Sequence, residues 1–142
     1  MSNSSRILVA VSTPWASERL FAMVRDLADR LNASVIVAHV ARASEQDETD
    51  NEAHVRARQT LATLTSRLAE AKVPAEGLLL YGADVARAIL NAAEAQHATM
   101  VVLGLSAKGR FARWFAGDVP DRVLRASPVP VLLYPPDWSG TV

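Results

Sequence analysis

Residues 101–134 read VVLGLSAKGRFARWFAGDVPDRVLRASPVPVLLY. An apolar run breaks at Gly104, a small and basic segment reaches a second glycine, Gly117, and a helical pattern then leads to another apolar run, Val129–Tyr134. Strand, glycine-led loop, helix and strand in this order are typical of the end of a parallel α/β sheet. Because open α/β sheets bind ligands beyond the carboxyl ends of their strands, we expect this loop to form one wall of any site.

The rest of the chain alternates in the same way. Apolar runs of strand length predict strands at Ile7–Val11, Val35–Val40, Leu78–Tyr81, Thr99–Leu103 and Val129–Tyr134. Apolar residues at helical spacing predict helices at Ala16–Leu31, Glu52–Ala71, Val85–Gln96 and Val119–Ala126, the last two capped by Asp84 and Asp118. This alternation predicts an α/β fold, a five-stranded parallel sheet with helices on both faces.

The chain of 142 residues is expected to form a single domain, 1–142. We expect flexible tails at 1–5 and 135–142. The segment 41–52 is rich in Asp and Glu, which favours a mobile, solvated loop, with a lid or a partner contact as the alternative.

Composition excludes several classes of function. Lys and Arg together number 15, as do Asp and Glu, so the formal net charge is zero and nothing attracts nucleic acid over long range. The absence of cysteine excludes thiol catalysis, disulfides and cysteine-ligated metals. Without a targeting signal or an apolar segment of membrane-span length, we expect a cytoplasmic protein that does not insert into membranes.

No catalytic or metal-binding group is predicted. His39, His54 and His97 fall in three different predicted elements, which favours ordinary hydrogen-bonded histidines over a metal site. The sequence has no G-x-S-x-G nucleophile elbow, and it lacks both the G-x-G-x-x-G and the P-loop phosphate motifs. The chain is therefore not expected to be an enzyme.

The loop after the fourth strand carries the one chemical signal. Gly104, the Ser106-Ala107 pair and Gly117 let a ligand approach the backbone closely, and three basic residues lie between the glycines, at Lys108, Arg110 and Arg113. A helix starting near Val119 directs its amide groups at the same region. These features indicate a generic anion site suited to a phosphate-bearing ligand.

Several segments together resemble the universal stress protein family, over nearly the whole chain. They are Ile7–Val11, Val35–Val40, Gly82–Asp84, Val101–Gly104, Gly117–Leu124 and Ser127–Leu132. The resemblance implies a Rossmann-like sheet of order 3-2-1-4-5, which reverses between Ser12 and Gly104. It also implies a homodimer that pairs its last strands, here Val129–Tyr134, edge to edge, or a domain attached to a parent transporter or another protein partner. An unpaired apolar edge strand would favour aggregation, so such a dimer is physically reasonable.

One branch of that family binds ATP or related nucleotides through G-x-x-G-x9-G-[ST] after strand four. In this chain the motif becomes Gly104-x-x-Ala107-x9-Gly117-Asp118, so the second glycine and the final hydroxyl are both replaced. The branch usually has an aspartate after strand one that holds the nucleotide, and that position resembles Ser12 here.

The three departures differ in their expected cost. Ala107 adds one methyl group, while Ser12 removes a charge-assisted contact worth about 1.5–3 kcal/mol. Asp118 places a carboxylate where a phosphate oxygen should bind, and at ~4 Å with an effective dielectric near 20 that repulsion is on the order of 4 kcal/mol. The exposed bases of the loop offset less than about 1 kcal/mol each. Tight ATP binding is therefore not expected.

Three hypotheses follow. The first is a dimeric, non-catalytic regulatory domain of the stress response that requires no cofactor. The second is an adenine-nucleotide sensor, with ATP, AMP or a related ligand held by Val11, Ser12, Val40, Gly104, Ala107, Gly117, Asp118 and Val119. The third, weak ATP hydrolysis, ranks last because no base, metal ligand or nucleophile is in place.

Overall fold

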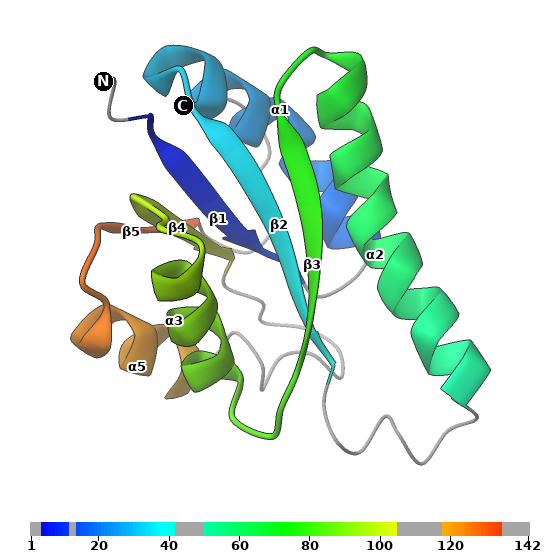
Figure 1. The fold of residues 1–142 in the computed structure, drawn as a ribbon, viewed down its shortest axis with the longest axis vertical. Helices are drawn as coiled ribbons and strands as arrows, with labels where there is room; N and C mark the ends of the chain where they lie inside the picture. Colours follow the sequence, from blue (N-terminus) through cyan, green and yellow to red (C-terminus); the bar gives the residue numbers. More distant parts are fainter. Residues whose placement is uncertain (1–3, 12–13, 42–49, 105–117, 135–142) are drawn as a thin grey trace.

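The computed structural model describes residues 4–11, 14–41, 50–104 and 118–134. Five parallel strands form one sheet of order β3-β2-β1-β4-β5 (Figure 1). Their bounds are β1 (Arg6–Ala10), β2 (Ser34–Ala41), β3 (Ala75–Tyr81), β4 (Met100–Gly104) and β5 (Val131–Tyr134). The predicted fold class and strand order are confirmed, and the order reverses between β1 and β4.

Helices cover both faces of the sheet. Helices α1 (Pro14–Leu31) and α2 (Asp50–Glu70) pack on one face, and α3 (Val85–Ala95) and α5 (Asp118–Ala126) pack on the other (Figure 1). Successive strand residues point to opposite faces, so Leu8 joins the α3/α5 core while Ile7 and Val9 join the α1/α2 core. Burial on both faces explains why the inner strands read as continuous apolar runs.

The two edge strands differ from their predicted bounds. Strand β3 begins at Ala75 rather than Leu78, because Ala75 and the residues after it pair with β2 from Val35 onward. Strand β5 begins at Val131 rather than Val129. The hydroxyl of Ser127 accepts from the N–H of Val129 at 3.2 Å and donates to its carbonyl oxygen at 2.7 Å, which holds Val129 in a local turn.

The predicted loop and tail bounds also change. Ala41 is the last residue of β2 and α2 begins at Asp50, so both ends of the predicted loop 41–52 belong to regular structure. Ser5 accepts a hydrogen bond from the N–H of Ser34 at 3.0 Å, so it is anchored to the sheet rather than part of a flexible tail. Residues 42–49, 1–3 and 135–142 lie outside the described residues.

Three helices end in the same way at the amino edge of the sheet. Asn32, Lys72 and His97, which follow α1, α2 and α3, all adopt positive φ, at 51°, 65° and 56°. In each case two backbone N–H groups after the helix donate to carbonyl oxygens of its last turns. After α2, for example, the N–H of Lys72 donates to the carbonyl of Ala69 and the N–H of Val73 to the carbonyl of Leu68. This is the Schellman arrangement, and the residue after each turn (Ala33, Val73, Ala98) is buried. The turn thus both ends the helix and directs the chain into the next strand.

Candidate functional site

The crevice expected to hold a ligand lies at the carboxyl edge of the sheet, where β1 and β4 are neighbours. The structure fully describes four of the eight predicted site residues, and all four lie at this edge: Val11, Val40, Gly104 and Val119. Ser12, Ala107 and Gly117 lie outside the described residues. Asp118 was predicted to be the N-cap that precedes the helix, but in the structure it is already the first residue of α5. The structure describes only the backbone of Asp118.

The three valines of this set are core residues. Val11 and Val40 are each 1% exposed and Val119 is 8% exposed. Val11 belongs to the α1/α2 core, whereas Val40 and Val119 belong to the α3/α5 core. They therefore form an apolar floor on both sides of the sheet edge and offer no polar side chain to a ligand.

Gly104 has a packing reason to be glycine. It ends β4 opposite Tyr134, the last residue of β5, and a Cβ built on Gly104 would overlap the hydroxyl and ring of Tyr134. Gly104 has no positive φ, so its backbone would accept other residues and only the space is missing. The position of the Tyr134 ring thus accounts for a glycine at this point without any ligand.

His39 is a buried polar residue at the same edge. It is 5% exposed, and its Nδ1 lies 3.0 Å from the carbonyl oxygen of Val11. A carbonyl oxygen only accepts, so Nδ1 carries the proton in this contact. The expectation of a hydrogen-bonded histidine is confirmed here, and the bond ties β2 to the residue that precedes Ser12.

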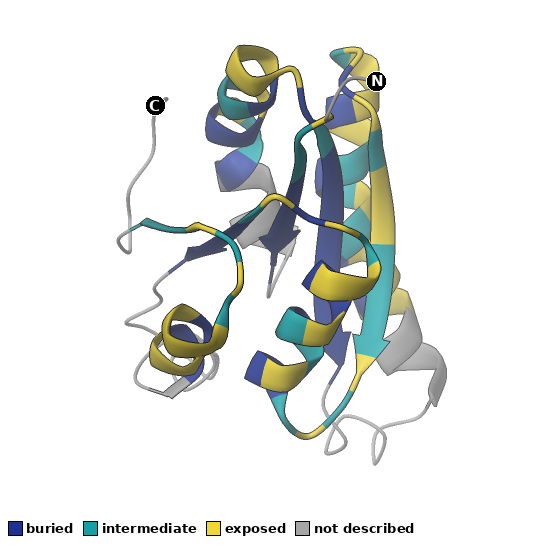
Figure 2. Cartoon of the chain, turned by 60° about the vertical axis from the view of Figure 1, so that its left-hand side comes forward, coloured by how far each residue is buried: buried dark blue, intermediate teal, exposed yellow. Residues whose placement is uncertain are grey.

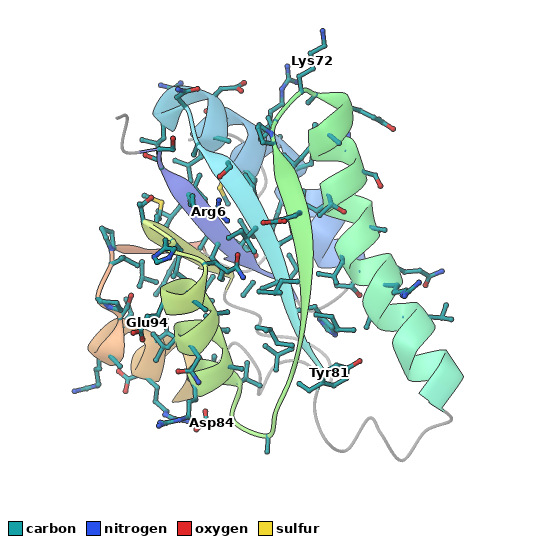
Figure 3. All side chains as sticks on the ribbon, viewed as in Figure 1. Arg6, Lys72, Tyr81, Asp84 and Glu94 are labelled. Atoms are coloured by element: carbon teal, nitrogen blue, oxygen red, sulfur yellow. The ribbon has the colours of Figure 1, made fainter. Side chains whose placement is uncertain are left out.

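A bidentate ion pair joins the two helices on the α3/α5 face. Arg122 of α5 donates from its two terminal nitrogens to the two carboxylate oxygens of Asp84, each at 2.8 Å. Asp84 also accepts from the backbone N–H of Arg87 at 3.1 Å, which confirms its predicted role as the N-cap of α3. Figure 3 places Asp84 at the start of α3, beside α5.

These donors hold the pKa of the Asp84 carboxyl below its ordinary value of 3.8, with Arg122 the largest cause and the Arg87 amide the next. The carboxylate is partly exposed, so the pair mainly fixes geometry. It positions the start of α5, and with it the backbone of Asp118, relative to α3. Arg122 lies within the segment Gly117–Leu124 of the family resemblance, and its contact with Asp84, 38 residues earlier in the chain, gives it a structural role.

The described residues contain no group of three or more His, Asp or Glu side chains that could hold a metal ion. In the same part of the chain, no helix combines the length and apolar character that a membrane span requires. His39, Tyr134 and the partnership of Arg122 with Asp84 were not predicted as site features. Each depends on strand register or helix packing, which no local sequence pattern carries.

The model of the universal stress protein family matches residues 3–135. The chain belongs to the universal stress protein family. No curated protein matches the sequence significantly.

Solved structures of universal stress proteins share this fold. A family protein from Burkholderia pseudomallei is 25% identical, with a TM-score of 0.72, covering 95% of this chain and 98% of its own. The universal stress protein of Archaeoglobus fulgidus in complex with dAMP is 20% identical, with a TM-score of 0.70 and coverage of 94% and 98%. A universal stress protein in complex with cAMP is also 20% identical, with a TM-score of 0.68 and the same coverage.

Proposed function

We propose that this universal stress protein domain is a dimeric, non-catalytic regulatory module of the cytoplasmic stress response that does not bind ATP tightly. The observation that carries the proposal is the position of Asp118 at the start of α5. A helix N-terminus is where a phosphate would meet backbone N–H groups, and here a carboxylate-bearing residue begins the helix. A residue with a negative charge at this point competes with a phosphate for the same amides.

The packing of the neighbouring residues supports the same interpretation. Gly104 matches the nucleotide motif, but its missing Cβ is accounted for by Tyr134. Asp84 and Arg122 are committed to each other through two hydrogen bonds. Motif residues of this domain thus have roles that need no nucleotide, and the domain can retain them for folding alone.

The energetic argument rests on charge. A carboxylate and a phosphate oxygen ~4 Å apart repel by on the order of 4 kcal/mol at an effective dielectric near 20, before relaxation. Replacing the usual aspartate after strand one by Ser12 removes a further contact of about 1.5–3 kcal/mol. Even half of this sum weakens binding by about a hundredfold, because each 1.4 kcal/mol is a factor of about ten.

An adenine-nucleotide sensor is the second candidate, favoured by one specific observation. Two of the similar structures are complexes with dAMP and with cAMP, ligands with a single phosphate. A monophosphate places less negative charge near Asp118 than a triphosphate does. A domain with Ala107 in place of the second motif glycine and with an acidic helix start would therefore select AMP-like ligands over ATP.

The partner of this module is proposed to be a second copy, paired through β5. This strand lies at one edge of the sheet, and all four of its residues, Val131–Tyr134, are half-buried. An edge strand with unsatisfied backbone groups favours pairing with another strand. A parent transporter or another protein partner is the alternative role for a regulatory domain of this kind.

Isothermal titration calorimetry with ATP and AMP tests the proposal. The wild-type domain is expected to bind ATP with a Kd above about 100 μM, and a Kd in the low micromolar range would overturn the proposal. The double variant Asp118→Ser/Ala107→Gly should bind ATP at least about tenfold more tightly, which corresponds to 1.4 kcal/mol.

Asp121→Ser is the matched control for this experiment. Asp121 lies three residues further along the same helix and pairs with Arg125 at 3.0 Å, so its loss removes one carboxylate from α5 and leaves Asp118 in place. If Asp121→Ser raises ATP affinity as much as the double variant, the effect is one of net charge and the argument from Asp118 fails. If wild type binds AMP but not ATP, the sensor hypothesis replaces the first.

A further inference from the structure

We propose that the outer edge of β3 is a second self-association surface, on which two copies pair antiparallel about a two-fold axis through Leu78. The inference goes beyond the β5 dimer because it concerns the opposite edge of the sheet. In the order β3-β2-β1-β4-β5, β3 has no neighbour on its outer side among the described residues. Figure 2 shows β3 along the margin of the sheet with exposed and half-buried residues, beside strands that are buried.

Strand β3 offers an unbroken row of backbone groups to a partner. The N–H of Val35 bonds to the carbonyl of Pro74 at 2.8 Å, and the N–H of Gly82 bonds to the carbonyl of Ala41 at 3.2 Å. In a parallel ladder these bonds recur at every second residue, so the even-numbered residues of β3 point their backbone groups at β2. The N–H and C=O groups of the odd-numbered residues point outward, at Ala75, Gly77, Leu79 and Tyr81.

The β5 edge offers less. The N–H of Val101 bonds to the carbonyl of Pro130 at 3.0 Å, so the backbone groups of Leu132 and Tyr134 also face β4. Within the described part of this edge the outward residues are then Val131 and Leu133, because the backbone of Val129 is occupied by the Ser127 hydroxyl. Two outward residues at β5 against four at β3 make β3 the longer template for a strand–strand contact.

The order of side-chain sizes along β3 fits a second copy of itself. On the α2 face, the first half of the strand carries the small residues Ala75 and Gly77, and the second half carries the large residues Leu79 and Tyr81. Antiparallel pairing centred on Leu78 sets Ala75 opposite the second copy's Tyr81 and Gly77 opposite its Leu79. Each large side chain then meets a small one, which is the self-complementarity that a two-fold interface requires.

The hydrogen-bond pattern allows the same register, and among the allowed registers this one pairs the most residues. Outward groups can bond only to outward groups, so odd-numbered residues must face odd-numbered residues across the interface. Centring on Leu78 satisfies this condition and uses the whole strand, Ala75–Tyr81. The single acidic residue of the strand, Glu76, lies 3.5 Å from Arg6 of its own chain and faces the second copy's Leu80, so no like charges oppose each other.

Helix α2 leaves room for this pairing. The guanidinium of Arg67 lies 4.1 Å from the ring centre of Phe21, which marks the flank of α2 that faces α1. Leu61 lies against Gly77, and at 3.6 residues per turn the flank beyond Leu61 carries Ala62, Thr65 and Ala69, with the exposed Arg58 among them. The three small side chains allow α2 of each copy to approach the other at a helix packing distance of about 8–10 Å, with the charged ends of the Arg58 side chains extending into solvent.

The large exposed apolar side chains at this end of the molecule agree with the inference. Tyr81 is 58% exposed at the end of β3, where Figure 3 labels it, and Val55 near the start of α2 is 54% exposed. Pairing would cover Tyr81 with the small end of the second strand. A monomer would leave this apolar edge strand open to solvent.

A cysteine test measures the register directly, since the chain contains no cysteine. In Leu78→Cys the two copies of residue 78 face each other as a non-hydrogen-bonded pair with Cα atoms about 4.5 Å apart, within disulfide reach. Leu80→Cys is the matched control, on the same face and equally half-buried. In Leu80→Cys the two cysteines would lie four residues apart along the paired strands, a separation of about 13 Å, which is too long for a disulfide bond.

Under mild oxidation at about 100 μM protein, Leu78→Cys should give at least tenfold more cross-linked dimer than Leu80→Cys on a non-reducing gel. Equal cross-linking of the two variants, or none in Leu78→Cys when the reduced protein has a wild-type circular dichroism spectrum, would overturn the proposal. The cross-linked species must also form in the double variant Leu78→Cys/Val131→Pro, because Val131→Pro removes an outward N–H from β5 and leaves the β3 edge unchanged.

Sedimentation velocity gives the second measurement. Gly77→Pro removes one outward N–H from β3 and leaves its bonds to β2 in place, because the amide points away from β2. It should weaken the β3 association at least tenfold while Val131→Pro does not. If Val131→Pro alone abolishes all self-association and Gly77→Pro changes nothing, the β5 dimer stands and the β3 pairing is refuted.

Discussion

The claim that Gly104 is glycine because of Tyr134 can be tested by adding one methyl group. In Gly104→Ala the new Cβ would overlap the hydroxyl and two ring carbons of Tyr134, so the ring has to move out of its packed position. Over-packing of this kind costs typically about 1–3 kcal/mol. For a domain of this size, each kcal/mol lowers Tm by about 2–4 °C, so a decrease of roughly 2–12 °C is expected.

Gly82→Ala is the matched control, because Gly82 lies at the carboxyl end of β3, directly after its last residue, as Gly104 lies at the carboxyl end of β4. A Cβ built there meets its nearest atoms at 4.0 Å, which is ordinary contact, so its Tm should change little. The rescue variant Gly104→Ala/Tyr134→Leu removes the ring that the methyl group strikes. The destabilisation by Gly104→Ala should be smaller in the Tyr134→Leu background, with a coupling free energy of about 1 kcal/mol or more.

Thermal unfolding followed by circular dichroism gives the Tm of each variant. Urea titration gives the free energies of unfolding of wild type, the two single variants and the double variant, from which the coupling free energy follows. A Tm for Gly104→Ala equal to that of Gly82→Ala would refute the packing argument. So would a Tyr134→Leu background in which Gly104→Ala costs as much as before. Either result would return Gly104 to an explanation based on ligand binding.

Three further perturbations follow from the site. Asp84→Asn keeps an N-cap and removes the charge facing Arg122. Wild type should be more stable than this variant above the ordinary carboxyl pKa of 3.8, and the difference should disappear as the pH falls through the lowered pKa of Asp84 in the folded state. Urea unfolding at a series of pH values measures this difference. A difference that does not depend on pH would contradict the ion-pair argument. His39→Leu leaves the buried Val11 carbonyl without its 3.0 Å donor and should cost about 1–3 kcal/mol by the same method; an unchanged stability would mean that the bond contributes nothing. Asp118→Ser/Ala107→Gly should raise ATP affinity at least about tenfold in calorimetry, and unchanged affinity would remove the charge argument.

The inner strands could be predicted from the sequence because their burial requires apolar residues at consecutive positions. The strands around Ile7–Ala10, Val35–Val40 and Met100–Gly104 are buried on both faces, and such strands read as unbroken apolar runs. The cap at Asp84 is likewise local and was predicted correctly. The strand order came from the family resemblance, because alternation alone does not say which strand lies beside which.

The edges and the site could not be predicted to the same degree. The first residues of β3, Ala75–Gly77, are small or polar and become a strand only through pairing with β2. The β5 boundary depends on a hydroxyl capturing the backbone of Val129. The contact of Tyr134 with Gly104 requires the register of two strands far apart in sequence. Each of these depends on a partner that local patterns do not reveal.

The three Schellman turns at the amino edge also offer a route to engineering the domain. Asn32, Lys72 and His97 hold left-handed conformations that cost a residue with a Cβ about 1–2 kcal/mol and cost glycine much less. Lys72 and His97 are exposed, so Lys72→Gly and His97→Gly should each raise the Tm without altering the core. Both lie at the amino ends of the strands, opposite to the carboxyl edge where Gly104 ends β4. A thermostable background of this kind would let the damaging substitutions at Gly104, His39 and the β3 edge be studied in a protein that still folds.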